Sequence, residues 1–511
     1  MQVLAGVALV ALYLWRLGAA PLFDVDEGAF AQASVEMIRS GDWGHTTLNG
    51  VDRFDKPILV YWLQAASLLI FGIHEWAVRL PSALSILLAT LAVGRFATRQ
   101  WGRTAGLYAA LILATSAGVL AIGRASTADG LLNALLIATA LSLWSHLESG
   151  ERAPLRWAYA WSALGVLTKG PIAILIPLAT LTLWALSRDR GRSAWRALTD
   201  LRGLLIFFVI AGPWYAYALM RHGDAFIEGF ILRHNVQRFA SALEGHSASL
   251  VYYLLVVPVL LMPWTPVLLS CVSQLRKQWT DPVLRYLWLW AGFVIAFFSI
   301  SGTKLPHYAL YGVAPLTLLM GRQLACAGHR LRRAVWGAVA VQCLFAALAP
   351  TIVANSAVHV DDVWIRDLLL TAPAGEALEW AGLLMLAAVA ILMYAGARRV
   401  RWAPAFMLPP LATAAVLSGL LWVGWLIPWV GQTLQEPFRK AGLWAHANDV
   451  ALVPFRMNMP SVLFYSGRWP GTTTPVPGDW ILQRRDRPWT SSALEPPVFE
   501  HRGLSIARIQ P

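Results

Sequence analysis

Three acidic residues in the stretch PLFDVDEGAFAQ, residues 21–32, could do chemistry: Asp24, Asp26 and Glu27. A carboxylate can accept a proton from a hydroxyl group or stabilise a developing positive charge. The stretch directly follows a nearly uncharged apolar segment, so these acids lie where the chain leaves an apolar environment. The alternative is structural, because acids also favour the first turn of a helix and can cap it.

Basic residues recur in short motifs at the ends of other apolar segments: Arg53 and Lys56 in VDRFDKPILVYW, Arg79 in EWAVRLPSAL, Arg124 in GRASTADG, Lys169 in LTKGP and Lys304 in TKLPHYALY. Lys and Arg neutralise phosphate through charge-assisted hydrogen bonds. Each of them alone could instead be an interface residue whose charged head reaches water. Several cations beside acids on one face favour a site for a phosphorylated ligand.

The composition indicates what positions these residues. The chain has 511 residues, of which 57% are hydrophobic and only 14% charged, and its mean hydropathy is +0.55. Soluble proteins carry about 25% charged residues, so we predict a polytopic α-helical membrane protein. The net charge of +13 does not indicate a nucleic-acid partner, because the basic residues are spread between apolar segments. The three cysteines have no CxxC spacing, which gives neither a disulfide scaffold nor a zinc motif.

Apolar runs of roughly 17–25 residues can cross a bilayer as helices. The sequence predicts thirteen such spans: 3–20, 75–95, 104–121, 128–147, 154–168, 171–187, 203–221, 249–273, 284–301, 306–325, 332–355, 376–397 and 405–429. The first has no basic segment before it, and we expect it to be retained and not cleaved as a signal peptide. Prolines inside spans, such as Pro213 and Pro263, are typical of kinked membrane helices.

Lys and Arg gather in alternate loops, above all after the sixth span, with Arg188, Arg190, Arg192, Arg196 and Arg202. Because such residues stay on the cytoplasmic side, we predict an inside N-terminus and an outside C-terminus. The expected domains are a transmembrane domain, 1–429, with outer loops 21–74 and 222–248, and an outer domain, 430–511.

The outer segments have local patterns of their own. EGAFAQASVEMIRSG predicts a short helix that ends at Gly41, and PILVYWLQAASLLIFG predicts an interfacial helix. In the tail, FRKAGLWAHA predicts a helix, and DVALVPF and DWILQRR predict strands. We therefore expect the tail to be a small α/β domain.

A lipid-linked phosphosugar would need this combination of features. Its tail would lie against apolar surface, its phosphate beside cations at the interface, and its sugar in the aqueous space above. As the phosphate leaves, a carboxylate can stabilise the electron-poor anomeric carbon or deprotonate an incoming hydroxyl. A transporter or lipid flippase is an alternative of another class, although transporters usually carry such charges near the midplane on repeated, broken helices.

Seven motifs, in order along residues 20–325, resemble those of the ArnT-like lipid A aminoarabinose transferase family: DEGAFAQASVEMIRSGDW, LNGVDRFDKPILVYWL, AVRLPSAL, GRASTADG, LTKGP, HNVQRF and SGTKLPHYAL. That family belongs to the GT-C membrane glycosyltransferases, which are related to the protein O-mannosyltransferases. The resemblance implies an inverting transfer of a sugar from a polyprenyl (undecaprenyl) phosphate donor to lipid A or another cell-envelope glycan. It also implies the bacterial inner membrane and a periplasmic active site. A protein or an O-antigen sugar is the alternative acceptor.

The resemblance implies roles for individual residues. Asp26, with Glu27 beside it, matches the key acid of the family, and Asp129 matches its second acid. Lys56 matches the ligand of the donor phosphate. The other substrate ligands would be Arg53, Tyr61, Arg79, Arg124, Lys169, Lys304, His307 and Tyr308. Asp55, where the family usually has Glu, forms with His234 a candidate site for a divalent cation.

The sequence departs from the family at one place beside the key acid. Members of the family typically carry DExRYA, whereas this chain reads DEGAFA, with Ala29 and Phe30 in place of Arg and Tyr. Because a cation beside the acid is missing, the sequence leaves the identities of the sugar and the acceptor open.

Overall fold

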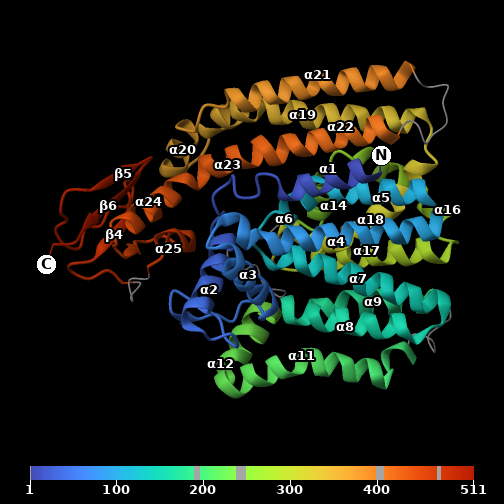
Figure 1. Cartoon of the computed structure of the whole chain (residues 1–511), viewed down its shortest axis with the longest axis horizontal. Coiled ribbons are helices and arrows are strands. Elements are labelled where there is room, and N and C mark those ends of the chain that lie inside the picture. Colours follow the sequence, from blue (N-terminus) through green and yellow to red (C-terminus); the bar gives the residue numbers. More distant parts are fainter. Residues whose placement is uncertain (1, 189–195, 238–248, 399–407, 469–473, 511) are drawn as a thin grey trace.

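The computed structural model describes residues 2–188, 196–237, 249–398, 408–468 and 474–510. Parts of three predicted features lie outside these residues: the end of the outer loop 222–248, the start of the span 405–429, and Arg190 and Arg192 of the basic loop. Long helices that run side by side form most of the molecule, and the two termini lie at opposite ends of this bundle (Figure 1).

Among the described residues, seven helical segments are long and apolar enough to cross a membrane. They are α4 (Glu75–Trp101), α7 (Ala128–Ser149), α11 (Leu201–His222), α17 (Pro282–Ile300), α19 (His329–Ala357), α21 (Glu376–Arg398), and the run of α22 (Leu408–Leu421), η5 (Trp422–Leu426) and α23 (Ile427–Leu434). An eighth is obtained if α5 (Arg103–Thr115) and α6 (Ala117–Gly123), which meet at a bend of 63°, count as one span. The protein is a multi-pass membrane protein of helical class.

The other predicted spans are also helical, but they are short or interrupted. They correspond to α1 (Gln2–Leu14), α8 (Arg152–Lys169), α9 (Ile172–Leu186), α14 (Tyr252–Leu260) with α15 (Thr265–Ser273), and η3 (Pro306–Gly312) with α18 (Val313–Ala325). One interruption is at a proline, which lacks the N–H group that a helix needs: Pro263 lies between α14 and α15. Thirteen crossings therefore stay a prediction.

Close packing joins α5 to α18 at a glycine. A Cβ atom on Gly321 would lie 2.6 Å from the backbone nitrogen of Ala109. The two backbones can approach this closely only because Gly321 has no side chain, which is a common device between membrane helices.

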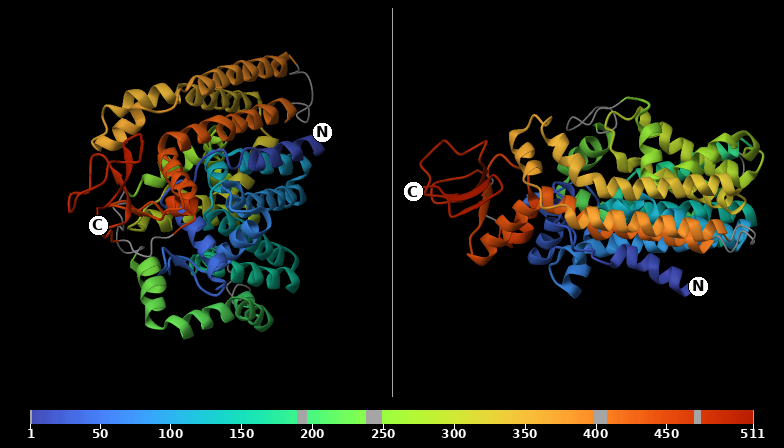
Figure 2. Two further views of the ribbon diagram at one scale, coloured as in Figure 1. Left: turned by 60° about the vertical axis from the view of Figure 1, so that its left-hand side comes forward. Right: turned by 90° about the horizontal axis from the view of Figure 1, so that it is seen from above.

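The elements of the two predicted outer loops and one later helix gather at one end of the bundle (Figures 1 and 2). They are α2 (Asp26–Ser40), β1 (Thr47–Leu48), β2 (Val51–Asp52), α3 (Leu59–Phe71), α12 (Asp224–Phe226), η1 (Ile227–Gln237) and the later helix, α20 (Val363–Leu370). The basic segment α16 (Leu275–Gln278) lies at the other end (Figure 1).

The prediction of a helix that ends at Gly41 is confirmed, since Gly41 follows α2 in the left-handed conformation. The prediction of a helix at α3 is confirmed as well. The β1–β2 hairpin was missed, although its turn, Asn49-Gly50, has the positive φ values that this dipeptide favours.

The last part of the chain forms a four-stranded sheet with two helices. It contains α24 (Glu436–Ala447), β3 (Leu452–Pro454), α25 (Pro460–Ser466), β4 (Trp480–Arg484), β5 (Phe499–His501) and β6 (Leu504–Arg508). The strand order is β3-β4-β6-β5, with β3 parallel to β4 and the other pairs antiparallel. The predicted helix and both predicted strands are confirmed. Trp364 and Leu368 of α20 are part of the same hydrophobic core, so an earlier loop packs into this region.

Candidate active site

A cavity of about 590 Å³ lies at the end of the bundle that carries α2 and α3. It brings together nine of the predicted site residues: Asp26, Arg53, Asp55, Lys56, Asp129, Lys169, His234, His307 and Tyr308. They come from α2, the loop before α3, the start of α7, the end of α8, η1 and η3. Residues that are far apart in the sequence therefore share one cavity.

Asp26 is the first residue of α2, and its side chain is exposed to this cavity. Within the described part of the chain, it forms no hydrogen bond or ion pair. The other acids of the cavity are engaged: Asp55 with Arg53, Asp129 with Lys169, and Asp52 with His45. Asp26 is therefore the acid that is open to a substrate.

Asp55 lies at the centre of a first polar cluster. The Asp55 carboxylate forms ion pairs with Arg53 Nη2 at 2.9 Å and with His234 Nε2 at 2.8 Å. Lys56 Nζ donates to the backbone carbonyl oxygen of Asp55 at 2.9 Å. Burial raises the pKa of Asp55, but the His234 hydrogen bond and the charge of Arg53 outweigh burial and hold that pKa well below its usual value. Asp55 therefore stays ionised and orients the cations around it.

Arg53 also connects this cluster to α3. Its Nε donates to the hydroxyl of Tyr61 at 3.1 Å, and its guanidinium lies over the ring of Phe30, which stacks on Tyr61. Tyr61 is fully buried and does not line the cavity. Its place is behind Arg53, as a support for that side chain.

The candidate cation site has two protein ligands, Asp55 and His234. In the described part of the chain, no group of three or more His, Cys, Asp or Glu residues is arranged to hold a metal ion. His234 Nδ1 is buried and has no hydrogen-bond partner there, while Nε2 is paired with Asp55. Because dedicated protein metal sites usually supply three or more ligands, the two residues alone do not complete one.

Asp129 is the centre of a second cluster. Lys169 Nζ lies 2.6 Å from its Oδ1, Tyr311 donates its hydroxyl to the same oxygen, and His307 Nε2 lies 3.9 Å from Oδ2. Lys169 also donates to the Tyr311 hydroxyl at 2.8 Å. The sequence analysis missed Tyr311, although it follows Tyr308 by three residues in η3, a spacing that puts both on one face of a 3-10 helix.

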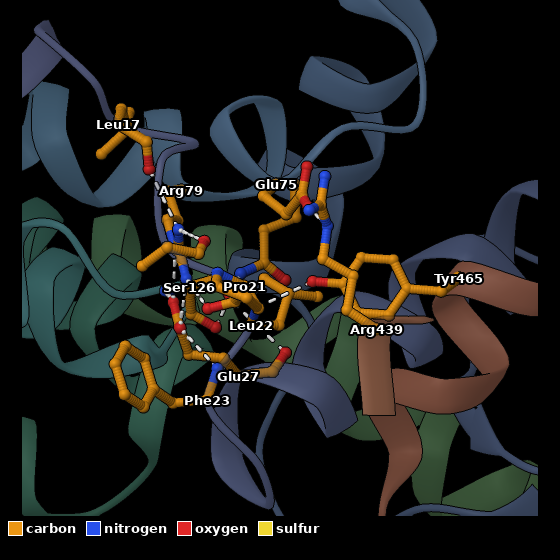
Figure 3. A network of polar contacts seen from close by, with 12 residues as sticks. Leu17, Pro21, Leu22, Phe23, Glu27, Glu75, Arg79, Ser126, Arg439 and Tyr465 are labelled. Atoms are coloured by element: carbon orange, nitrogen blue, oxygen red, sulfur yellow. Dashed lines mark hydrogen bonds and ion pairs between the residues drawn. The ribbon is translucent and has the colours of Figure 1, made fainter. Parts of the chain in front are cut away.

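Glu27 and Arg79 do not line the main cavity; they form a buried ion pair beside it (Figure 3). Arg79 Nη2 and Nε lie 2.7 and 2.9 Å from the carboxylate of Glu27, which also accepts from the backbone nitrogen of Ser126 at 2.7 Å. Burial raises the pKa of Glu27, but the charge and hydrogen bonds of Arg79, together with the backbone N–H groups of Phe23 and Ser126, outweigh burial and lower that pKa. This pair holds the chain on either side of Asp26.

Arg124 and Lys304 also lie outside the main cavity. Arg124 donates to the carbonyl oxygens of Leu12 and Tyr13, in the last turn of α1, and of Trp15, which follows α1. Lys304 Nζ donates to the carbonyl of Ser301 at 2.8 Å. Both cations therefore satisfy backbone groups where helices end.

Two further cavities adjoin the main one. The second, of about 320 Å³, shares Lys56 and Lys169 with it and runs along apolar side chains of α9, η1 and α17: Ile172, Leu175, Ile231, Phe297 and Phe298. The third, of about 430 Å³, shares Asp26 and His307 and is mainly apolar, with Arg16, Arg79, Arg124, Asp24 and Glu27 as further charged residues in its wall. Asp26 and His307 therefore lie where an amphipathic cavity meets the polar one.

Comparisons with known proteins show what this chain is similar to. Residues 55–217 match the family model described as dolichyl-phosphate-mannose-protein mannosyltransferase. The chain is 28% identical over 440 residues to the undecaprenyl phosphate-alpha-4-amino-4-deoxy-L-arabinose arabinosyl transferase of Yersinia pestis (strain Pestoides F), covering 83% of this chain and 76% of that protein. It is 28% identical over 362 residues to the protein of the same name from Shewanella sediminis, covering 68% of this chain and 64% of that protein, just under two thirds of its length.

Solved structures of ArnT from Cupriavidus metallidurans match nearly the whole chain. One of them, the crystal structure bound to undecaprenyl phosphate, matches with a TM-score of 0.84 and 22% identity, covering 99% of this chain and 97% of that one. At this identity the likeness shows that the two chains share a fold.

Proposed function

We propose that the chain is an ArnT-like glycosyltransferase of the GT-C type, which transfers a sugar from a polyprenyl-phosphate carrier, undecaprenyl phosphate, to lipid A or another cell-envelope acceptor. We further propose that it lies in the bacterial inner membrane, with α2 and α3 on the periplasmic side. The basic segment α16, with Arg276 and Lys277, would then be cytoplasmic, as the retention of Lys and Arg on that side requires.

The observation that carries the proposal is the open carboxylate of Asp26 in a cavity lined by Arg53, Lys56 and Lys169. The cations would hold the donor phosphate and stabilise it as it leaves. The second cavity would hold the start of the polyprenyl tail, since its walls are apolar and it reaches the same two lysines. The sugar would then lie in the main cavity beside Asp26.

In this arrangement the acceptor oxygen attacks the anomeric carbon from the side opposite to the phosphate. The bond between that carbon and the phosphate oxygen breaks, and undecaprenyl phosphate leaves with the electron pair. If the acceptor is a hydroxyl group, Asp26 takes its proton; if it is a phosphate, which is already ionised and needs no base, Asp26 offsets the positive charge that develops on the sugar. One displacement inverts the anomeric carbon.

The third cavity supports an amphipathic acceptor. It meets the main cavity at Asp26 and His307, its walls are mostly apolar, and its charged side chains carry both signs. Acyl chains would lie against the apolar walls, and a phosphate or a polar sugar would face Asp26. Lipid A has both parts, whereas a soluble protein has no tail for such a cavity.

Mass spectrometry of envelope lipids and glycans tests the proposal. Cells that express the gene should carry lipid A, or another envelope glycan, with one added sugar that disappears when the gene is deleted. Purified protein in liposomes should transfer the same sugar from undecaprenyl phosphate to that acceptor. Unchanged envelope glycans, together with no transfer in liposomes, would contradict the proposed activity.

Lys56→Ala should weaken binding of the donor. Loss of one hydrogen bond to a charged phosphate corresponds to about a 10- to 100-fold rise in Kd. Binding of undecaprenyl phosphate to the purified protein measures the effect directly, and the apparent KM for the donor should rise with it. Lys277→Ala, on an exposed lysine of α16, is the control and should leave both values unchanged. Normal affinity in the Lys56 variant would place the phosphate elsewhere.

A further inference from the structure

A short arm of the C-terminal region, residues 455–466, reaches the main cavity. Asn458, in the loop before α25, lines that cavity together with Asp26 and Lys56. The residue is exposed, so its amide group is accessible at the wall of the space in which a substrate would lie. An uncharged amide both donates and accepts hydrogen bonds, which suits sugar hydroxyl or amino groups better than a phosphate.

The same arm holds the turn that carries Asp26. The backbone nitrogen of Ser461 donates to Oδ1 of Asp24 at 3.0 Å, and the Ser461 hydroxyl donates to Oδ2. Asp24 lies two residues before Asp26, and Ser461 is almost completely buried. Because both carboxylate oxygens are bonded to one residue of the arm, the orientation of the turn depends on the arm.

A glycine makes this close approach possible. A Cβ atom on Gly28, in the first turn of α2, would lie 2.0 Å from Asp24 Oδ1 and 2.6 Å from the backbone nitrogen of Ser461. Any side chain at this position would have to displace the arm or the Asp24 carboxylate. The contact between α2 and α25 is thus built into the sequence of both segments.

Two further contacts fasten the C-terminal region beside the same turn (Figure 3). The backbone nitrogen of Leu22 donates to the hydroxyl of Tyr465 at 2.8 Å. Arg439 Nε, on α24, lies 3.1 Å from Glu75 Oε1 at the start of α4, one turn before Arg79. The C-terminal region is therefore attached both to the catalytic turn and to the helix that supports it.

We propose that this arm completes the active site: Asn458 contacts the transferred sugar, and Ser461, acting through Asp24, positions Asp26. The proposal rests on the proposed sugar transfer. In this proposal the C-terminal arm binds the sugar, and Lys56 and Lys169 bind the phosphate, so different regions of the chain bind the two parts of the donor. Ser461 is a positioning residue, because it touches Asp24 and does not line the cavity.

Binding measurements on the full-length protein separate these roles. For Asn458→Ala we expect the KM for the sugar-bearing undecaprenyl-phosphate donor that the wild type uses to rise about tenfold, the effect of one hydrogen bond, with unchanged affinity for undecaprenyl phosphate alone. Asn448→Ala is the matched control, because Asn448 is exposed directly after α24 and its side chain donates to the carbonyl oxygen of Trp444 in that helix. Equal loss of affinity for both lipids, or for neither, would overturn the role of Asn458.

For Ser461→Ala we expect about a tenfold fall in kcat with little change in KM. The carboxylate of Asp24 would lose the hydrogen bond from the Ser461 hydroxyl, and the turn that carries Asp26 would be held less firmly. Hydrogen–deuterium exchange of residues 21–32 should become faster in this variant and stay unchanged in Ser492→Ala, on an exposed serine of the same region. Unchanged exchange in the Ser461 variant would overturn the positioning role. This readout does not need a donor. If the wild type failed to bind undecaprenyl phosphate, the proposed function would fail, and the exchange experiment would still decide whether Ser461 holds the turn.

Discussion

Replacing Asp26 with Asn is expected to abolish sugar transfer, with kcat falling by about 10²- to 10⁴-fold, while undecaprenyl phosphate still binds. Asn has the shape of Asp, but it cannot take a proton or offset a positive charge. Asp26 is exposed and forms no hydrogen bond or ion pair within the described ranges, so the fold does not depend on it. The rate of single-turnover transfer in liposomes measures the chemical step. The affinity of the variant for undecaprenyl phosphate shows whether the binding site is intact.

The matched control for this variant is Asp367→Asn. Asp367 is an exposed acid on α20, at the same end of the bundle, and it does not line the main cavity. Its substitution should leave kcat and binding unchanged. Transfer at the wild-type rate by the Asp26 variant would remove this carboxylate from the mechanism. Loss of transfer in both variants would point to a general effect of charge at this end of the molecule.

Arg79→Ala is expected to destabilise the protein by about 3–5 kcal/mol, the usual cost of leaving one member of a buried ion pair without its partner. Arg79 and Glu27 are 2% and 3% exposed. The guanidinium also donates to the carbonyl oxygens of Leu17, Ala20 and Pro21, which would lose their partners together. Thermal unfolding of the protein in detergent should therefore shift to a clearly lower temperature.

An exposed pair of the same chemistry provides the control for this variant. Arg485 lies 2.8 Å from Glu500, and their side chains are 73% and 49% exposed. Such pairs contribute about 0–1 kcal/mol, so Arg485→Ala should hardly change the unfolding temperature. If both variants unfolded at the same temperature as the wild type, the network around Glu27 would not hold this end of the molecule together.

The site illustrates what sequence reasoning could and could not reach. It could group Asp26, Lys56 and Lys169, because each lies in a charged motif at the end of an apolar segment, and such ends meet at one membrane face. It could not separate Asp26 from Glu27. Consecutive helix residues point in directions about 100° apart, and only the packing of α2 decides that Glu27 faces Arg79 and Asp26 faces the cavity.

Long-range contacts set the other limit. Nothing local to Asn458 or Ser461 indicates a neighbour more than 400 positions earlier, since the contact arises only when α25 packs on α2. The hairpin at Asn49-Gly50 is different, because its turn signal was present in the sequence. The spans were predicted well where apolar runs are continuous, as in α4, and less well where prolines and 3-10 turns divide them, as at η3.

The two side cavities have a consequence for the order of events. Under the proposed function, the tail of the carrier lies in the second cavity and the acceptor lies in the third. Asp26 lines both the third cavity and the main one. Both lipids can then be present at once, so the kinetics should be sequential and no glycosyl-enzyme need accumulate. The hydrocarbon tail of each lipid can stay in the bilayer throughout the reaction. Undecaprenyl phosphate and the glycosylated product can then diffuse away by separate routes.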